Sequence, residues 1–112
     1  MQAFELADLL AERASEGKPY HEFVRVPDLS VGLYVLPAGG TDPQRPHTED
    51  EVYYVARGSG QIEVEGESRS VHAGSVIYVP ARAAHRFHTI EEALEILVFF
   101  APAEYARGEQ PQ

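Results

Sequence analysis

The stretch at residues 46–58, Pro-His-Thr-Glu-Asp-Glu-Val-Tyr-Tyr-Val-Ala-Arg-Gly, places a histidine and a carboxylate directly before a strand-forming run. His47 precedes Glu51, and residues 52–55 are valines and tyrosines, which favour β-strands. Imidazole and carboxylate groups bind divalent transition metals. A solvated pair on a polar loop would look the same. The stretch therefore indicates a metal site only if other ligands join it.

Length and composition predict one small globular domain. The chain has 112 residues, 44% of them hydrophobic and none of them cysteine. Disulfides, thiolate metal sites and cysteine nucleophiles are therefore excluded. The formal net charge of −9 argues against a nucleic-acid partner, which requires a basic surface. We find neither an apolar run of transmembrane length nor a signal-like N-terminus, so we expect a cytoplasmic protein with no membrane partner.

The spacing of apolar residues predicts one helix followed by a series of β-strands. Leucines recur at helical spacing within residues 4–14, and Gly17 and Pro19 end that helix. From Tyr20 onward the apolar pattern has a period of two. The expected strands are residues 21–26, 30–36, 51–56, 61–65, 68–71, 75–79, 85–90 and 93–100, the second of them buried on both faces.

Turns and termini complete the expected organisation of a single domain spanning residues 1–112. Residues 1–19 form its helical segment, 20–101 its β-barrel and 102–112 a polar, frayed tail. Arg57-Gly58 and Glu91-Glu92 are expected to end strands. Many short strands separated by such turns are typical of an all-β barrel or sandwich.

Two motifs resemble those of the cupin superfamily of small double-stranded β-helix, or jelly-roll, barrels. The first family motif has a glycine, two histidines, a glutamate and a second glycine at fixed spacing. Its places are occupied here by Gly39, Arg45, His47, Glu51 and Gly58. Arg45 therefore replaces the first histidine of the family pattern.

The second family motif has two glycines around a proline, then a histidine and an asparagine. Its places are occupied by Gly74, Pro80, Arg82, His85 and Thr89, so that Arg82 replaces a glycine and Thr89 the asparagine. The resemblance implies an all-β, cupin-type jelly-roll barrel with one short N-terminal helix. It implies less about function, because the family includes dioxygenases, isomerases, decarboxylases, sensors and metal-free binders.

The resemblance and the alternation of strand residues favour the same metal ligands. Alternate strand residues share a face, so Glu51 points with Tyr53, and His85 with Phe87 and Thr89. With His47, they would offer two imidazoles and a carboxylate. That set suits one divalent transition metal, Fe, Mn, Ni, Cu or Zn, with open positions for other ligands. The alternatives are hydrogen-bonded histidines in a metal-free pocket and a buried carboxylate paired with an arginine.

The expected substrate-binding residues are Arg45, Tyr53 and Phe87. An inward-pointing Arg45 would hold a carboxylate bidentately, whereas an outward-pointing one would be an ordinary surface charge. The aromatic side chains of Tyr34, Tyr53, Tyr78 and Phe87 are alternatively expected in the core of a small barrel. Gln44 and Asp42 are alternative metal ligands from the preceding loop. His21, His72 and His88 are expected outside the site.

The function that we expect is that of a metal-binding small cupin. In one hypothesis it is a metal-dependent enzyme, dioxygenase- or isomerase-like, acting on a small organic substrate that is acidic if Arg45 points inward. The alternative is a non-catalytic cupin that binds or senses a small ligand. A homodimer is expected, because small barrels have edge strands that pairing protects. Residues 23–26 and the helix are the expected dimer contacts.

Overall fold

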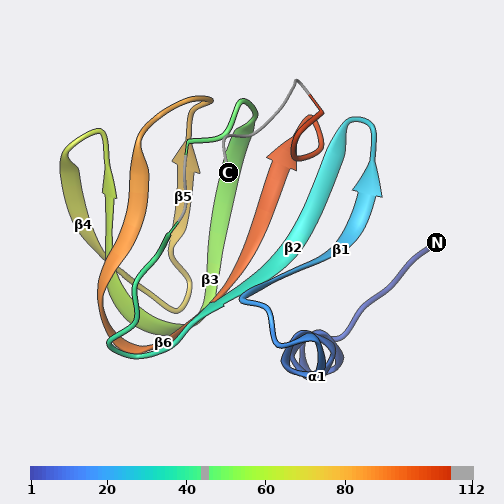
Figure 1. Ribbon diagram of the computed structural model, residues 1–112, viewed down its shortest axis with the longest axis horizontal. Coiled ribbons are helices and arrows are strands. Elements are labelled where there is room, and N and C mark those ends of the chain that lie inside the picture. Colours follow the sequence, from blue (N-terminus) through green and yellow to red (C-terminus); the bar gives the residue numbers. More distant parts are fainter. Residues whose placement is uncertain (44–45, 107–112) are drawn as a thin grey trace.

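The computed structural model describes residues 1–43 and 46–106, in which one helix precedes a single antiparallel sheet (Figure 1). The strand order is β1-β2-β6-β3-β4, and β5 pairs with β3. This arrangement confirms the predicted all-β fold with one short helix. The elements are α1 (Leu6–Glu16), β1 (Tyr20–Val26), β2 (Leu29–Leu36), β3 (Asp50–Val64), β4 (Glu67–His72), β5 (Val76–Val79) and β6 (His85–Ala101).

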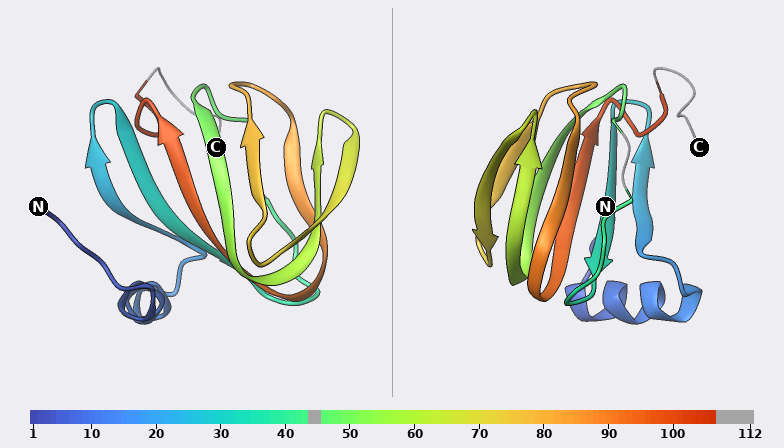
Figure 2. Two further views of the ribbon diagram at one scale, coloured as in Figure 1. Left: turned by 180° about the vertical axis from the view of Figure 1, so that it is seen from behind. Right: turned by 60° about the vertical axis from the view of Figure 1, so that its left-hand side comes forward.

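The two longest strands, β3 and β6, run through both halves of the curled sheet (Figures 1 and 2). The predicted turns at Arg57-Gly58 and Glu91-Glu92 are therefore wrong. Register shifts between Val55 and Gln61 bend β3 without ending its pairing to β6. At the bend Gly58 has a φ of 97°, and an added Cβ would lie 2.0 Å from the Ala93 carbonyl oxygen. Only glycine fits there.

Helix α1 lies outside the sheet beside β1 (Figure 2). It begins and ends later than the predicted residues 4–14, and it ends where Gly17 takes a left-handed conformation with a φ of 72°. Leu9 is buried, and His21 of β1 contacts Glu12 and Glu16 of the helix at 3.1 and 3.0 Å. Within the described part of the chain, no helix has the length and apolar character needed to cross a membrane.

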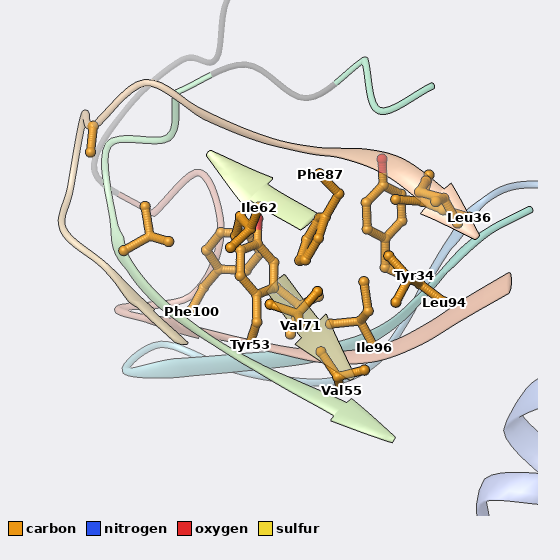
Figure 3. Packing of buried hydrophobic residues seen from close by; sticks show 14 residues of the cluster. Tyr34, Leu36, Tyr53, Val55, Ile62, Val71, Phe87, Leu94, Ile96 and Phe100 are labelled. Atoms are coloured by element: carbon orange, nitrogen blue, oxygen red, sulfur yellow. The ribbon is translucent and has the colours of Figure 1, made fainter. Parts of the chain in front are cut away.

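The core lies inside the curl of the sheet (Figure 3). As predicted, β2 is buried along both faces over most of its length. Two expectations are wrong. Tyr78 is 60% exposed on the outer face of β5, and Thr89 is exposed because its φ of 49° interrupts the alternation in β6. The labelled core residues are Tyr34, Leu36, Tyr53, Val55, Ile62, Val71, Phe87, Leu94, Ile96 and Phe100.

Residues 102–106 are not the frayed tail that the sequence predicted. Ala103 and Glu104 are buried, because their main chain is hydrogen-bonded to the hairpin of β1 and β2. The Ala103 N–H donates to the Pro27 carbonyl at 3.2 Å, and the Glu104 N–H donates to Ser30 Oγ at 2.9 Å. Arg25 Nη2 donates to the Glu104 carbonyl at 2.8 Å. The rest of the predicted tail, residues 107–112, lies outside the described residues.

Candidate metal centre

The three side chains predicted as metal ligands lie together inside the barrel. One ligand atom each from His47, Glu51 and His85 lies within 4.8 Å of the others. Their side chains are 10%, 1% and 1% exposed. Each therefore offers a nitrogen or oxygen atom to one small volume from which water is nearly excluded.

The curl of the sheet brings these residues together from distant parts of the chain. Glu51, the second residue of β3, pairs with Phe100 near the end of β6, whereas His85, the first residue of β6, pairs with Val64 at the end of β3. The two ligand positions therefore sit at opposite ends of the same strand pair and face each other only because that pair bends. His47 precedes β3, and its carbonyl accepts the Arg82 N–H at 2.6 Å.

Hydrogen bonds hold both ring nitrogens of His85. Its Nδ1 lies 2.9 Å from the Ala83 carbonyl, which can only accept, so Nδ1 carries a proton. Its Nε2 lies 3.1 Å from Glu51 Oε1. Burial alone would lower the pKa of His85, but the hydrogen bond and charge of Glu51 outweigh it and raise that pKa above the ordinary value. Without an ion, His85 and Glu51 therefore form a buried, charge-assisted pair.

The side chain of His47 lies between two carboxylates. Its Nε2 is 3.0 Å from Glu104 Oε2, and its Nδ1 is 3.7 Å from Glu51 Oε1. The second distance is too long for a hydrogen bond. His47 Nδ1 and Glu51 Oε2 are both buried without a hydrogen-bond partner. Two unpaired lone-pair atoms beside a third ligand atom fit a bound cation, which would satisfy both.

Glu104 is a site residue that the sequence did not predict. It follows β6 in a polar stretch, outside both motifs, and nothing in its neighbourhood of the sequence distinguishes it from the exposed acids of the chain. The adjacent Tyr105 ring stacks near His47, with 6.2 Å between ring centroids. Glu49 is buried and accepts the Tyr105 N–H at 3.0 Å.

Tyr20 is a second residue that the sequence did not place in the site. Its ring lies over Gly32, where an added Cβ would approach the ring atoms to 2.2 Å. Its hydroxyl is buried without a hydrogen-bond partner. Burial, and then the negative charges of Glu104, Glu22 and Glu51, raise the pKa of Tyr20. The hydroxyl therefore stays protonated and is available as a donor. Its only signal in the sequence is its place at the start of the alternating pattern.

The predicted substrate-binding residues are only partly described. Tyr53 and Phe87 are fully buried and pack edge to face, with 4.9 Å between their ring centroids. The Tyr53 ring is also 6.0 Å from the His85 ring, so both side chains form a wall behind the site. Arg45 and Gln44 lie outside the described residues. The contact of all three predicted residues with a substrate stays a prediction.

Three other polar residues weighed from the sequence lie in different surroundings. Asp42 accepts hydrogen bonds from the Tyr34 hydroxyl and, at 2.8 Å, from the Phe87 N–H, so it fastens its loop to the barrel. His88 lies on the outside of β6 and contacts Ser68 at 3.3 Å, while His72 is exposed. These two histidines lie away from the cluster, as expected.

Comparison with known proteins defines the family. Residues 32–100, more than half of the chain, match the cupin domain. The chain belongs to the cupin family. This cupin is 52% identical over 104 residues to an uncharacterized protein of Streptomyces coelicolor, an alignment that covers 93% of this chain and 99% of that protein.

Two further relatives carry more descriptive names. The acireductone dioxygenase 3 of Physcomitrium patens is 33% identical over 85 residues, which cover 71% of this cupin but only 42% of the dioxygenase. The structure of KdgF from Halomonas sp. superimposes with a TM-score of 0.68 at 24% identity, covering 74% of this chain and 76% of that one. The structural likeness establishes the shared barrel.

Proposed function

We propose that this cupin binds one divalent transition metal through His47 Nδ1, Glu51 and His85 Nε2. The observation that carries the proposal is the convergence of three buried ligand atoms, with His47 Nδ1 and a Glu51 oxygen lacking hydrogen-bond partners. Two neutral imidazoles and one carboxylate leave part of the ion's charge uncompensated and positions free for other ligands. Nitrogen and oxygen ligands of this kind suit Mn, Fe, Ni, Cu or Zn.

We further propose that the bound ion serves an enzyme acting on a small organic molecule. A metal of this kind polarises a bound oxygen atom as a Lewis acid. The buried Tyr20 hydroxyl would donate a hydrogen bond to the ligand, while Tyr53 and Phe87 exclude water from behind the site. The partial relationship to a dioxygenase supports a catalytic role.

The space beside the centre supports a small ligand. His85 borders an open depression of about 280 Å³, near the lower end of the range for ligand sites. The other residues around it are Pro46, Glu63, Gly66, Ala84 and Arg86. Arg86 and Glu63 form an ion pair at 3.8 Å on its rim, so these lining residues carry no net charge.

Elemental analysis tests the metal proposal directly. The protein is expressed with Mn, Fe, Ni, Cu or Zn supplied in turn, and we expect one ion per chain for at least one metal. His85→Ala should lose stoichiometric metal, because it removes a ligand from a three-residue set. His88→Ala, on the outside of the same strand, is the matched control and should keep it. The proposal fails if the unaltered protein retains none of the five metals.

A non-catalytic ligand-binding cupin is the second candidate function. It is favoured by two polar contacts that form without an ion, in which His85 pairs with Glu51 and His47 with Glu104. A metal-free cup of this kind should be stabilised thermally by a small ligand in the presence of a chelator. Stabilisation that requires added metal would instead favour the enzyme.

We also propose a homodimer, the assembly expected from the sequence. Strand β1 stands at one end of the strand order, so its outer backbone groups lack a neighbouring strand within the described sheet. Val26 and Leu29, at the hairpin between β1 and β2, are 48% and 36% exposed. Sedimentation that gives only a 12.4 kDa species at micromolar concentration would exclude the dimer. A cytoplasmic location stays a prediction.

A further inference from the structure

The segment at residues 102–106 delivers a carboxylate to the metal centre from outside both cupin motifs. Its position is set by its main chain, since the Glu104 N–H donates to Ser30 Oγ at 2.9 Å and Arg25 donates to the Glu104 carbonyl at 2.8 Å. The Tyr105 N–H is held by Glu49 at 3.0 Å. The Glu104 side chain is therefore directed by a backbone anchored on both sides and does not depend on its own carboxylate for its place.

The two ring nitrogens of His47 differ in their surroundings. Nε2 has an acceptor at hydrogen-bonding distance, Glu104 Oε2 at 3.0 Å. Nδ1 has none, because the nearest carboxylate oxygen, on Glu51, is 3.7 Å away. An ionised carboxylate can only accept a hydrogen bond, so the nitrogen that faces Glu104 must carry the proton. A neutral imidazole then has its lone pair on Nδ1, the nitrogen that faces Glu51 and His85.

We propose that Glu104 is a positioning residue that fixes the tautomer and orientation of His47, so that Nδ1 presents its lone pair to the metal. The proposal rests on the proposed metal-binding function and adds a residue to it. Carboxylates that accept the second N–H of a metal-binding histidine orient the ring and raise its basicity. The Ala83 carbonyl holds the Nδ1–H of His85 in the corresponding way, leaving Nε2 to face the centre.

The geometry separates this role from direct coordination. The ring of His47 stands between Glu104 on one nitrogen and Glu51 on the other, so the carboxylate of Glu104 lies behind His47 as seen from the other ligands. The compact ligand cluster accordingly comprises His47, Glu51 and His85 alone within the described residues. Glu104 therefore acts through His47, whereas the three clustered residues act on the ion.

The first experiment reads the tautomer of His47 in the metal-free protein. Nitrogen-15 NMR near pH 8, where an ordinary imidazole is neutral, should show the proton on Nε2 of His47. Glu104→Gln should preserve this tautomer, since an amide oxygen still accepts, whereas Glu104→Ala should shift the population toward Nδ1–H. Glu67→Gln, the same loss of charge at an exposed residue of β4, is the control. A proton on Nδ1 in the unaltered protein, or an unchanged spectrum in Glu104→Ala, would overturn the proposal.

The second experiment measures metal affinity by calorimetric titration with the ion that the unaltered protein retains. Glu104→Ala should weaken binding by about 10–100-fold, and Glu104→Gln by less, while Glu67→Gln should leave it unchanged. Equal affinity in Glu104→Ala and the unaltered protein contradicts a positioning role. Complete loss, as in His47→Ala, also overturns it, because Glu104 would then be a ligand.

The two experiments separate this inference from the proposed function. If the unaltered protein binds no metal but shows the predicted tautomer, the metal proposal fails and the role of Glu104 in orienting His47 stands. If it binds metal but the tautomer does not depend on Glu104, the inference alone fails. Circular dichroism and thermal melting establish that each variant is folded, as expected from the main-chain contacts that hold residue 104.

Discussion

The interior of the barrel contains two regions of opposite character built on the same two strands. In the apolar region, the middle of β3 and β6 contributes Val55, Leu94 and Ile96, none of them measurably exposed to solvent. At the candidate metal centre, the starts of the same strands contribute Glu51 and His85, which are almost as deeply buried. Strand geometry is therefore common to both regions, and only the choice of side chain differs.

The difference between the regions shows what each contributes to the molecule. Burial of apolar side chains stabilises the fold in proportion to the area removed from water. Burial of a polar atom without a hydrogen bond costs about 1–3 kcal/mol. Two such atoms, on His47 and Glu51, lie in the centre. The unpaired atoms of the centre thus destabilise the fold locally, and a bound ion would remove this cost. The apolar region supplies the stability that offsets it.

The largest effect is expected when one member of the buried His85–Glu51 pair is removed. Glu51→Met leaves His85 without its charged partner and should destabilise the metal-free protein by about 3–5 kcal/mol. The double variant Glu51→Met/His85→Leu replaces both polar groups by apolar ones. It should recover the lost stability. Its free energy of unfolding should equal that of the unaltered protein or exceed it by about 1–4 kcal/mol. Urea denaturation of metal-free samples gives all three values.

That pair of variants decides whether the centre weakens the fold. Both should fail to bind metal, so stability and metal binding would be separated in the double variant. If the two substitutions instead add, with the double variant less stable than the single one, the polar centre contributes stability and the contrast between the two regions is wrong.

A comparable loss is expected from a cavity in the apolar region, but without a loss of metal. Ile96→Ala removes a fully buried side chain and should cost about 2–5 kcal/mol in the free energy of unfolding. Metal affinity of the folded variant should stay unchanged. Val76→Ala, at a side chain that is 65% exposed, is the control and should change stability by less than about 0.5 kcal/mol. Weakened metal binding in Ile96→Ala would show that the regions are coupled.

Smaller effects are expected at two backbone positions where this chain departs from the family motif. Arg82 and Thr89 have φ values of 67° and 49°, a left-handed region that glycine and asparagine adopt more readily. Arg82→Gly and Thr89→Asn should each stabilise the protein by about 1 kcal/mol. Arg86→Gly, within regular β6, should instead destabilise it by about 0.5–1 kcal/mol. Thermal melting checks the signs, and loss of stability in the first two variants would refute the strain.

The last prediction concerns pH and applies to the metal-free protein. The pKa of His85 is raised in the folded state, so protonation of His85 stabilises folding below its ordinary pKa of 6.5. This stability should be lost as the pH rises through the raised value. Metal binding needs the deprotonated imidazole, so stabilisation by metal should increase over the same range. Denaturation at stepped pH, with and without metal, measures how the stability of the metal-free protein and its stabilisation by metal each change with pH. In the double variant lacking His85, the loss of stability at rising pH should disappear.

The sequence predicted the apolar pattern and the convergence of the three candidate ligands better than the limits of the strands. Alternation and motif spacing were sufficient for Glu51 and His85, because each lies at the start of a strand. They failed at Gly58, where glycine accommodates a close approach of β6 rather than a turn. Glycine is favoured both at a bend within a strand and in a hairpin turn, so the sequence cannot distinguish the two. The pairing of β3 with β6 does so.

Glu104 and Tyr20 were missed for a different reason. Both reach the site through tertiary contacts, Glu104 through the hairpin that holds its main chain and Tyr20 through the space left by Gly32. Neither contact has a signature in local sequence. The same holds for Tyr78, whose aromatic character suggested the core although the outward face of β5 exposes it.

The position of β6 in the strand order has a consequence for synthesis on the ribosome. Strand β6 is the link between the β1–β2 hairpin and β3, since β2 pairs only with β1 and β6 among the described strands. While β6 is still inside the exit tunnel, the largely apolar strand β2 of the emerged hairpin is paired with β1 on one edge and has no neighbour on the other. Closure, and with it the assembly of a pocket for an ion, must follow translation through residue 104. Until β6 emerges, the nascent hairpin therefore exposes the edge of β2 that pairs with β6, and metal would enter the complete pocket only after synthesis.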